Sequence, residues 1–368
     1  MSGPVLVARL DSMGDVLISG PAIRAVAHQA DVVMLCGPLG AGGAALLPGI
    51  DRTIVWEAPW ISEPWRVVSR EHTEGLISAV RATGAREAVI LTSFHQSPLP
   101  LAMLLRLAGV ERITGASVDH AGSLLDVRLR PGEDLPEALP EPERALAIAE
   151  AAGFPSVDDG RLAVVPTPDT RSLTGAGPYV ALHAGAAVPA RRWPVQHFAR
   201  LAHLLHQSGR TVVLTGSAGE AELTARIRAE APRAIDLAGA CTTLELAGVL
   251  AGADVLVSGN SGPAHLAAAV GTPVVSLFSP VVPAVKWAPY GVPVRLLGDQ
   301  EAGCKDSRAR GCPVPGHPCL AGVMPETVLA AIEDLEPARR QNADLPRTDH
   351  RQPSQTALAP RGVQEGRR

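Results

Sequence analysis

The stretch that decides the fold spans residues 254–265 and reads Asp254-Val255-Leu256-Val257-Ser258-Gly259-Asn260-Ser261-Gly262-Pro263-Ala264-His265. Its apolar first half predicts a buried strand, and Pro263 stands where a helix can begin, because the first helical position needs no N–H. The loop at 259–262 can point backbone N–H groups at an anion such as a diphosphate, which the helix dipole also favours. A helix capped by Ser261 or Asn260 with no ligand is an equally good interpretation of this stretch alone.

On either side of this stretch, apolar strands alternate with amphipathic helices in two series. In the first series we expect strands at 4–10, 31–36, 52–56 and 88–92, and helices at 16–26, 75–82, 99–107 and 143–151. In the second we expect strands at 179–182, 211–215, 234–236, 255–258 and 274–278, and helices at 195–207, 220–229, 244–251 and 263–269. This alternation predicts an α/β fold whose parallel sheets are covered by helices.

A stretch rich in Pro, Gly and Asp within residues 131–178 separates the two series and predicts a domain boundary. We expect one domain over 1–160, a second over 175–336, and a disordered tail of low apolar content over 337–368. A chain of 368 residues that is 46% apolar is long enough for two cores. Two such domains would bind a ligand between the carboxyl ends of their sheets.

Charge, apolar runs and cysteine content argue against a nucleic-acid-binding protein, a membrane-spanning protein and a secreted disulfide-linked protein. The net charge of −4 gives no general attraction to polyanions, so we expect no nucleic-acid partner. No apolar run approaches the roughly 18 residues of a membrane span, and no secretion signal opens the sequence, which predicts a cytoplasmic protein. Five cysteines, an odd number, argue against a secreted disulfide scaffold.

Two further strand-to-helix loops carry candidate chemistry. Residues 183–194 read His183-Ala184-Gly185-Ala186-Ala187-Val188-Pro189-Ala190-Arg191-Arg192-Trp193-Pro194, and planar guanidinium groups suit phosphate oxygens. The alternative is a solvated basic turn. Residues 11–15 read Asp11-Ser12-Met13-Gly14-Asp15, in which a carboxylate can take a proton from an attacking hydroxyl or simply cap the helix.

Taken together, the three loops resemble glycosyltransferase family 9, the ADP-heptose:lipopolysaccharide heptosyltransferases and their relatives. The resemblance rests on residues 9–17, on 183–186 with 191–194, and on 259–278, and it spans roughly residues 4–335. It implies the GT-B fold, in which two Rossmann-like domains face each other across a cleft. It also implies inversion at the anomeric carbon without a metal or a cofactor, and the sequence holds no Asp-x-Asp metal motif.

The resemblance implies a role for individual residues. Asp15 is the expected general base. The second domain would bind the nucleotide-sugar through Gly185, Ala186, Arg191, Arg192, Glu220, Thr242, Asn260, Ser261, Gly262 and His265. Either Glu220 or Glu222 would hold the ribose. Asn260 departs from the aspartate of some heptosyltransferases, and Ala186 and Ala187 from hydroxyl residues, which leaves the donor less well defined than the reaction.

The function implied is transfer of a heptose-like sugar from an ADP-sugar to a hydroxyl of a glycan or glycolipid acceptor. The enzyme would act in the cytoplasm or at the inner face of the membrane. A sugar-nucleotide-binding GT-B protein of another class, such as an epimerase or a catalytically silent homologue, is the alternative. Asp15 discriminates the two, because only transfer requires a base at that position.

Two weaker patterns favour other chemistry. Residues 40–45 match the dinucleotide pattern G-x-G-x-x-A, but Pro48 leaves room for only a very short helix, so we interpret them as a Gly-rich turn. Cys304, Cys312, Cys319 and His317 could supply four metal ligands. Their spacing is wider than that of structural zinc sites, which favours a packed loop and no metal.

Overall fold

The computed structural model describes residues 3–342, with side chains described as far as residue 336. The last helix, α14 (Pro325–Asn342), extends beyond the expected domain end at residue 336. The rest of the expected tail, residues 343–368, lies outside the described residues. No helix within the described range is both long enough and apolar enough to cross a bilayer.

The first lobe is a sheet of six parallel strands in the order β3-β2-β1-β4-β5-β6. Its strands are β1 (Val5–Arg9), β2 (Val32–Cys36), β3 (Arg52–Val55), β4 (Glu87–Ile90), β5 (Arg112–Ala116) and β6 (Val127–Leu129). Its helices are α1 (Met13–Ile18), α2 (Gly20–Ala27), α3 (Ala41–Ala44), α4 (Arg70–Arg81), α5 (Leu99–Ala108) and α6 (Glu141–Ala152), with the 3-10 turn η1 (Gly122–Leu124). Both β1 and β2 are buried along their whole length, which explains their continuous apolar runs.

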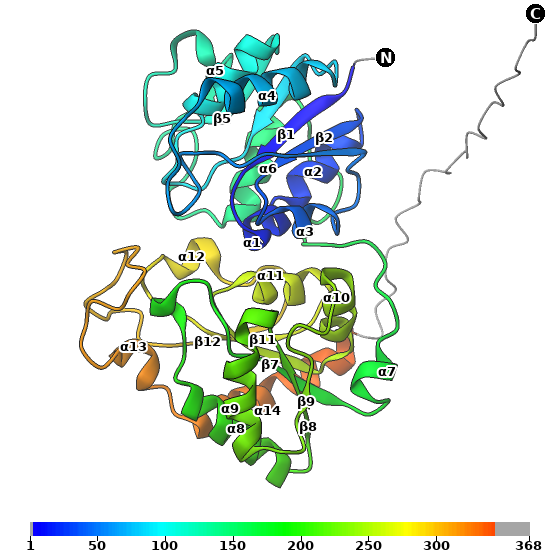
Figure 1. Ribbon diagram of the computed structural model, residues 1–368, viewed down its shortest axis with the longest axis vertical. Helices are drawn as coiled ribbons and strands as arrows, with labels where there is room; N and C mark the ends of the chain where they lie inside the picture. The colour runs from blue at the N-terminus through cyan, green and yellow to red at the C-terminus, as the bar shows by residue number, and fades with distance from the viewer. Residues whose placement is uncertain (1–2, 343–368) are drawn as a thin grey trace, which may run out of the picture.

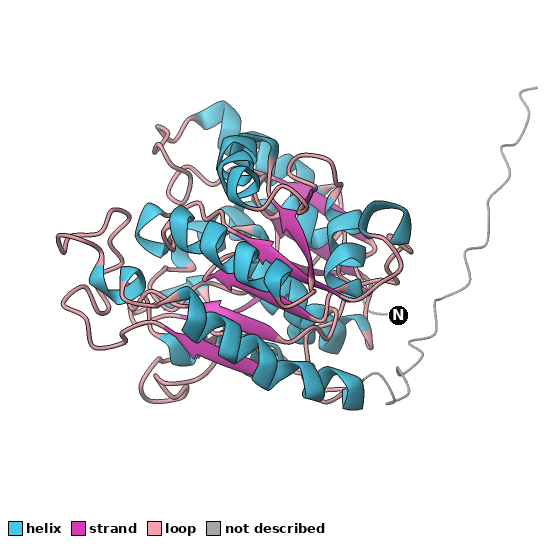
Figure 2. Cartoon of the chain, turned by 90° about the horizontal axis from the view of Figure 1, so that it is seen from below, coloured by secondary structure: helices cyan, strands magenta, loops and turns pink. Residues whose placement is uncertain are grey.

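The second lobe repeats this plan in the order β12-β11-β10-β7-β8-β9, again all parallel. Its strands are β7 (Tyr179–His183), β8 (Thr211–Thr215), β9 (Ile235–Asp236), β10 (Val255–Gly259), β11 (Val274–Leu277) and β12 (Val294–Leu297). Its other elements are α7 (Arg171–Thr174), η2 (Pro189–Arg191), α8 (Val195–Gln207), η3 (Ala218–Glu220), α9 (Ala221–Glu230), α10 (Thr243–Gly252), α11 (Gly262–Ala269), α12 (Ala284–Trp287), α13 (Pro318–Ala321) and α14. Helices flank the strands on both sides (Figure 2). The predicted α/β fold with parallel sheets is confirmed.

Some local predictions are wrong. The single helix expected at 16–26 is two helices that meet at Ser19, because the ring of Pro21 cannot follow the carbonyl of Leu17 in one continuous helix. The strands β5, β6 and β12 are absent from the sequence prediction.

The helix after Gly40, α3, has only four residues, as the proline at 48 indicated.

In each lobe the strand order reverses direction at one point, between β1 and β4 and between β7 and β10. Open parallel sheets bind ligands beside the carboxyl ends of the strands at such a point. Figure 1 shows the lobes stacked, with α1 and α3 of the first above α10, α11 and α12 of the second. A ligand site is therefore expected at the loops that follow β1, β4, β7 and β10.

Candidate functional site

The loops that follow β1 and β10 meet at the junction of the lobes. A Cβ atom added at Gly14 would lie 2.9 Å from Cδ2 of His265 and 3.2 Å from Cα of Gly262. A Cβ atom added at Gly262 would lie 2.7 Å from Cε of Met13. A Cβ atom at either position would displace a neighbouring group, so glycine at both positions lets the backbones of α1 and α11 pack close together.

Asp15 lies in the first turn of α1 and its side chain is 19% exposed. Its Oδ2 accepts hydrogen bonds from the backbone N (3.1 Å) and the Oγ (2.6 Å) of Ser12. The carboxylate also interacts electrostatically with Arg191 and His265 of the second lobe. Asp15 therefore caps its helix and faces the second lobe at the same time, so the two interpretations of this residue are compatible.

Arg9 lies beneath Asp15 with only 1% of its side chain exposed. Its Nη2 donates to Oγ of Ser93 at 2.9 Å and to Oδ1 of Asp15 at 3.3 Å. Its Nη1 lies 3.5 Å from Oε2 of the buried Glu141. Its Nε lies 2.8 Å from Oδ2 of Asp11, an ion pair whose angle does not make a hydrogen bond. One guanidinium thus serves three carboxylates.

The pKa values reflect this crowding. The pKa of Arg9 is raised, because burial, which lowers it, is outweighed by the three carboxylates. Burial raises the pKa of Asp11 to about 6. The positive charge of Arg9 opposes this rise, and the negative charge of Asp15 adds to it. Asp11 also accepts hydrogen bonds from Gln96 and Ser93. The base of the loop is therefore a polar network in which removal of one member affects the others.

The loop between β10 and α11 leaves the helix end open. Ser261 occupies the N-cap position, but its Oγ lies 3.0 Å from Oγ of Ser258 and donates to the carbonyl of Gly259 at 3.3 Å. Within the described part of the chain no side chain caps α11, and Asn260 is 6% exposed. The simple capped-helix interpretation therefore does not account for this loop, and the positive helix end remains available to an anion.

His265 lies one turn into α11 and is 5% exposed. Burial lowers the pKa of His265 to about 4; Asp15 opposes this shift and Arg191 adds to it. Its Nδ1 is buried and has no hydrogen-bond partner among the described residues. The ring is therefore neutral at pH 7 and has an unused polar atom beside the junction.

The lowered pKa of His265 predicts a pH effect on stability. The unfolded ring, with a pKa near 6.5, binds a proton as the pH falls, whereas the folded ring does not until about pH 4. The stability that the neutral ring contributes above pH 6.5 is therefore lost between pH 6.5 and 4, by up to about 3 kcal/mol. Urea midpoints measured across this range should fall less steeply for His265→Gln than for the wild type. Parallel curves would contradict this interpretation.

The two arginines of the second loop have different surroundings. Arg191 ends η2 and is partly buried, and its Nε is buried with no partner in the described range. Burial lowers the pKa of Arg191, Asp15 raises it, and Arg310 lowers it again. Arg192 is exposed and its Nε donates to the carbonyl of Ala186 at 2.8 Å, which braces the loop. Arg191 is therefore the arginine whose charge reaches Asp15.

The remaining predicted donor residues lie elsewhere in the second lobe, in the loops after β7 and β8 and at the start of α10. A Cβ atom added at Gly185 would lie only 1.7 Å from Oε1 of Glu220, so the carboxylate rests on the backbone of this loop. Oε2 of Glu220 accepts from the backbone N (2.7 Å) and Oγ (2.9 Å) of Ser217. Thr242 caps α10, and its Oγ1 donates to Glu245 at 2.8 Å. Glu222 is exposed in the first turn of α9.

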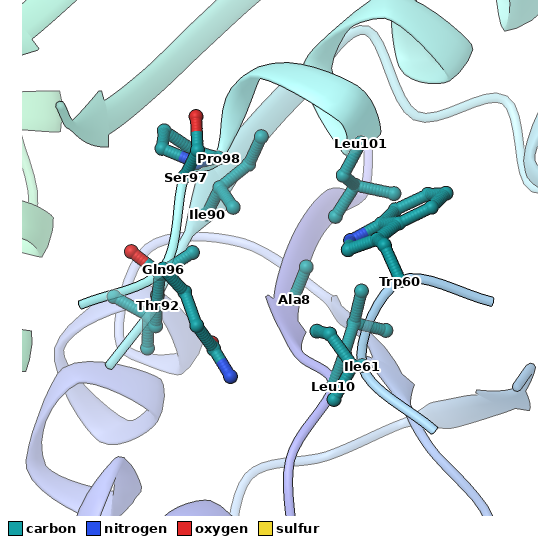
Figure 3. A pocket seen from close by; sticks show the side chains of 11 residues that line it. Ala8, Leu10, Trp60, Ile61, Ile90, Thr92, Gln96, Ser97, Pro98 and Leu101 are labelled. Carbon is teal, nitrogen blue, oxygen red and sulfur yellow. The ribbon is translucent and has the colours of Figure 1, made fainter. Parts of the chain in front are cut away.

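The small apolar pocket in Figure 3 lies in the first lobe, at the carboxyl ends of β1 and β4. Leu10, Trp60, Ile61 and Leu101 line it, together with Gln96, whose amide bonds Asp11. Its volume of about 10 Å³ has room for no more than one water molecule. This pocket is therefore too small to hold a sugar.

The cysteine-rich loop is packed. Cys304 and Cys319 are buried in the core of the second lobe, and Nε2 of His317 lies 3.1 Å from the carbonyl of Ala190. Nowhere in residues 3–342 do three or more His, Cys, Asp or Glu side chains form a group that could hold a metal ion.

Arg9, Ser93 and Arg308 are not among the site residues predicted from the sequence. Arg9 ends an apolar strand run, and a charge in that position was the one available signal of a buried ion network. Ser93 follows β4, at the first lobe's reversal point, so the strand order would have indicated it.

Comparisons with known proteins identify the family of this chain. The family model described as glycosyltransferase family 9 (heptosyltransferase) matches residues 95–317. Lipooligosaccharide heptosyltransferase 2 of Haemophilus influenzae is 30% identical over 183 residues, which cover 45% of this chain and 49% of that protein. The chain thus spans about half the length of the curated relatives it matches.

Two solved structures from Escherichia coli share the whole two-lobed arrangement. ADP-heptose lipopolysaccharide heptosyltransferase II is 23% identical with a TM-score of 0.72, covering 92% of this chain and 100% of that chain. Heptosyltransferase WaaC is 21% identical with a TM-score of 0.66, covering 90% and 99%. At these identities the likeness concerns the fold, and it confirms the predicted GT-B architecture.

Proposed function

Because the chain belongs to glycosyltransferase family 9, we propose that it transfers a heptose-like sugar from an ADP-sugar to a hydroxyl of a glycan or glycolipid. The transfer inverts the anomeric carbon and uses no metal ion. One observation carries the proposal: Asp15 of the first lobe faces the uncapped end of α11 and the charge of Arg191 in the second.

Asp15 acts as the general base. Its carboxylate takes the proton of the acceptor hydroxyl, and the acceptor oxygen then bonds to the anomeric carbon. The bond from that carbon to the diphosphate oxygen breaks, and its electron pair leaves with the nucleotide diphosphate. Attack from the face opposite the leaving group inverts the configuration, and the arrangement of Asp15 across the junction from the α11 loop supports that geometry.

The leaving diphosphate is stabilised by fixed positive groups. Arg191 offers a buried Nε without a partner in the described range, and a guanidinium can hold phosphate oxygens by two parallel hydrogen bonds. The N-terminus of α11 adds a backbone N–H and roughly half a positive charge. Such preorganised donors act most strongly in a site shielded from water, as the burial of Asn260 and His265 provides. Arg192 and Ala186 brace the loop that carries Arg191.

ADP-heptose is the proposed donor. The WaaC relative was solved with ADP-2-deoxy-2-fluoro heptose, and we extend that donor class to this chain. Glu220, held against Gly185, is the better candidate than the exposed Glu222 to accept hydrogen bonds from the ribose. Thr242 borders the base, with its hydroxyl already engaged by Glu245.

The donor is tested by thermal unfolding with ADP-, UDP-, GDP- and dTDP-sugars in the presence of EDTA. ADP-heptose at about 100 times its dissociation constant should raise the free energy of unfolding by about 2.7 kcal/mol, and the other nucleotides by less. No stabilisation by ADP or ADP-heptose would contradict the proposal.

A glycan or glycolipid acceptor at the inner membrane face completes the proposal. Trp65, Val67 and Val68 are 81%, 92% and 58% exposed. They follow Glu63, which pairs with Arg310 across the junction at 2.8 Å, so this apolar segment lies beside the rim of the site. Apolar and aromatic side chains at a rim suit a lipid surface. Failure to sediment with glycolipid vesicles would contradict this part.

A further inference from the structure

Three non-glycine residues in the described chain have a left-handed backbone, and all three lie in one loop. They are Asp306 (φ 56°), Arg308 (φ 55°) and His317 (φ 50°). Asp and His tolerate this conformation better than most residues, whereas arginine has no such advantage. A costly backbone persists only where surrounding contacts impose it, and such residues concentrate at functional sites. The left-handed backbone of Arg308 is therefore the least expected of the three.

The contacts that impose the conformation tie the loop to the donor side of the site. The backbone N of Asp306 donates to the carbonyl of Pro280, and that of Arg308 to the carbonyl of Val281, both at 2.8 Å. The carbonyl of Arg310 accepts from the backbone N of Ala190 at 2.9 Å, directly before Arg191. With Cys304 and Cys319 buried in the core, the loop is fixed beside the phosphate-binding arginine.

This loop directs Arg308 across the junction. Cζ of Arg308 lies 4.9 Å from the ring centroid of Phe94 in the first lobe, and Nζ of Lys286 lies 4.5 Å from the same centroid. Lys286 also donates to the carbonyl of Glu137. Both cations are thus held on one aromatic ring in the loop after β4.

Among residues 3–336, whose side chains are described, Arg308 pairs with no carboxylate. Arg310, two positions later, pairs with Glu63 at 2.8 Å. His95, the neighbour of Phe94, keeps part of its ring accessible to solvent. Desolvation of the rest of the ring, and then the charge of Arg308, lower the pKa of His95 to about 4, and Asp15 opposes the shift. The same ring thus feels the charge of Arg308 and the charge of the proposed base.

We propose that Arg308 binds an anionic substituent of the acceptor, a carboxylate or a phosphate, and so selects acidic over neutral sugars. The guanidinium matches either group by two parallel hydrogen bonds. Arg308 is exposed, lies over Phe94 of the first lobe, and acts on the same His95 ring as Asp15. This inference rests on the proposed function, because it takes the junction beside Asp15 as the acceptor site.

The test measures binding of D-glucose, D-glucuronate and D-glucose 6-phosphate to the full chain saturated with ADP. The wild type should bind at least one of the two anions about 10- to 100-fold more tightly than glucose, and the tighter one identifies the substituent. Arg308→Gln should remove this preference and leave ADP binding unchanged. Arg200→Gln, an exposed arginine on α8, is the matched control and should keep the preference.

An anion preference that survives in Arg308→Gln, or a wild type with no preference, would overturn the assignment of Arg308. Loss of ADP binding in the wild type itself would instead contradict the proposed donor site, so the two failures are distinguishable. A fall of the anion preference in Arg308→Gln with ADP affinity intact supports the inference, because a merely structural defect would lower both.

Discussion

Replacing Asp15 with asparagine is expected to lower kcat about 10²- to 10⁴-fold while leaving the dissociation constant of the donor within about twofold. Asparagine keeps the size of the side chain and an oxygen that can accept from Ser12, so the cap of α1 persists. It cannot take the proton of the acceptor hydroxyl. The measurement is steady-state release of ADP alongside calorimetric titration with ADP.

The control for this variant is Glu71→Gln, which changes an exposed acid in the first turn of α4 and should leave kcat unaltered. An Asp15→Asn protein with wild-type turnover would remove Asp15 from the role of base. A wild type that binds the donor but transfers no sugar to any acceptor would favour the alternative, a sugar-nucleotide-binding protein of another class.

Replacing Arg9 with methionine is expected to lower the free energy of unfolding by about 3–5 kcal/mol. Methionine fills much of the volume of arginine but carries no positive charge. Asp11, Asp15 and Glu141 then lose their shared cation and must either remain charged without a partner or take up protons. The side chain is 1% exposed, so water cannot replace the guanidinium. The measurement is urea unfolding followed by tryptophan fluorescence, with Arg9→Lys as an intermediate case.

Arg70→Met is the matched control, because Arg70 is 90% exposed and, among the side chains that the structure describes, pairs only with Glu74 one turn later. Exposed pairs of this kind contribute about 0.3–0.5 kcal/mol. If the Arg9 and Arg70 variants unfold at similar urea concentrations, the buried network does not hold the loop of Asp15 in place. Stability would then come from the surrounding apolar core alone.

Long buried elements of this fold could be predicted from sequence, and short or mixed ones could not. The apolar runs of β1, β8 and β10 predict strands at the positions where the structure has them, and α8 begins and ends as its pattern indicates. In contrast β6 has three residues, and β5 contains a glycine that weakens its strand signal. Their positions depend on pairing with neighbouring strands, which local sequence does not encode.

The site divides in the same way. Asp15, Arg191 and the 259–262 loop lie in motifs at strand ends, where chemistry and position coincide in the sequence. Arg9 is buried against Ser93, which lies 84 positions further along the chain, and Arg308 lies over Phe94 of the other lobe. No local pattern specifies such contacts, so these two residues emerge only from the structure.

The central claim is inverting, metal-independent transfer from ADP-heptose with Asp15 as base. The most direct test is proton NMR of the glycoside formed by the wild type from ADP-heptose in excess EDTA, which reports the anomeric configuration of the new bond. The expected product has a configuration opposite to that of the donor and forms at the same rate with and without EDTA. A product of retained configuration, or a reaction abolished by EDTA, would contradict the claim.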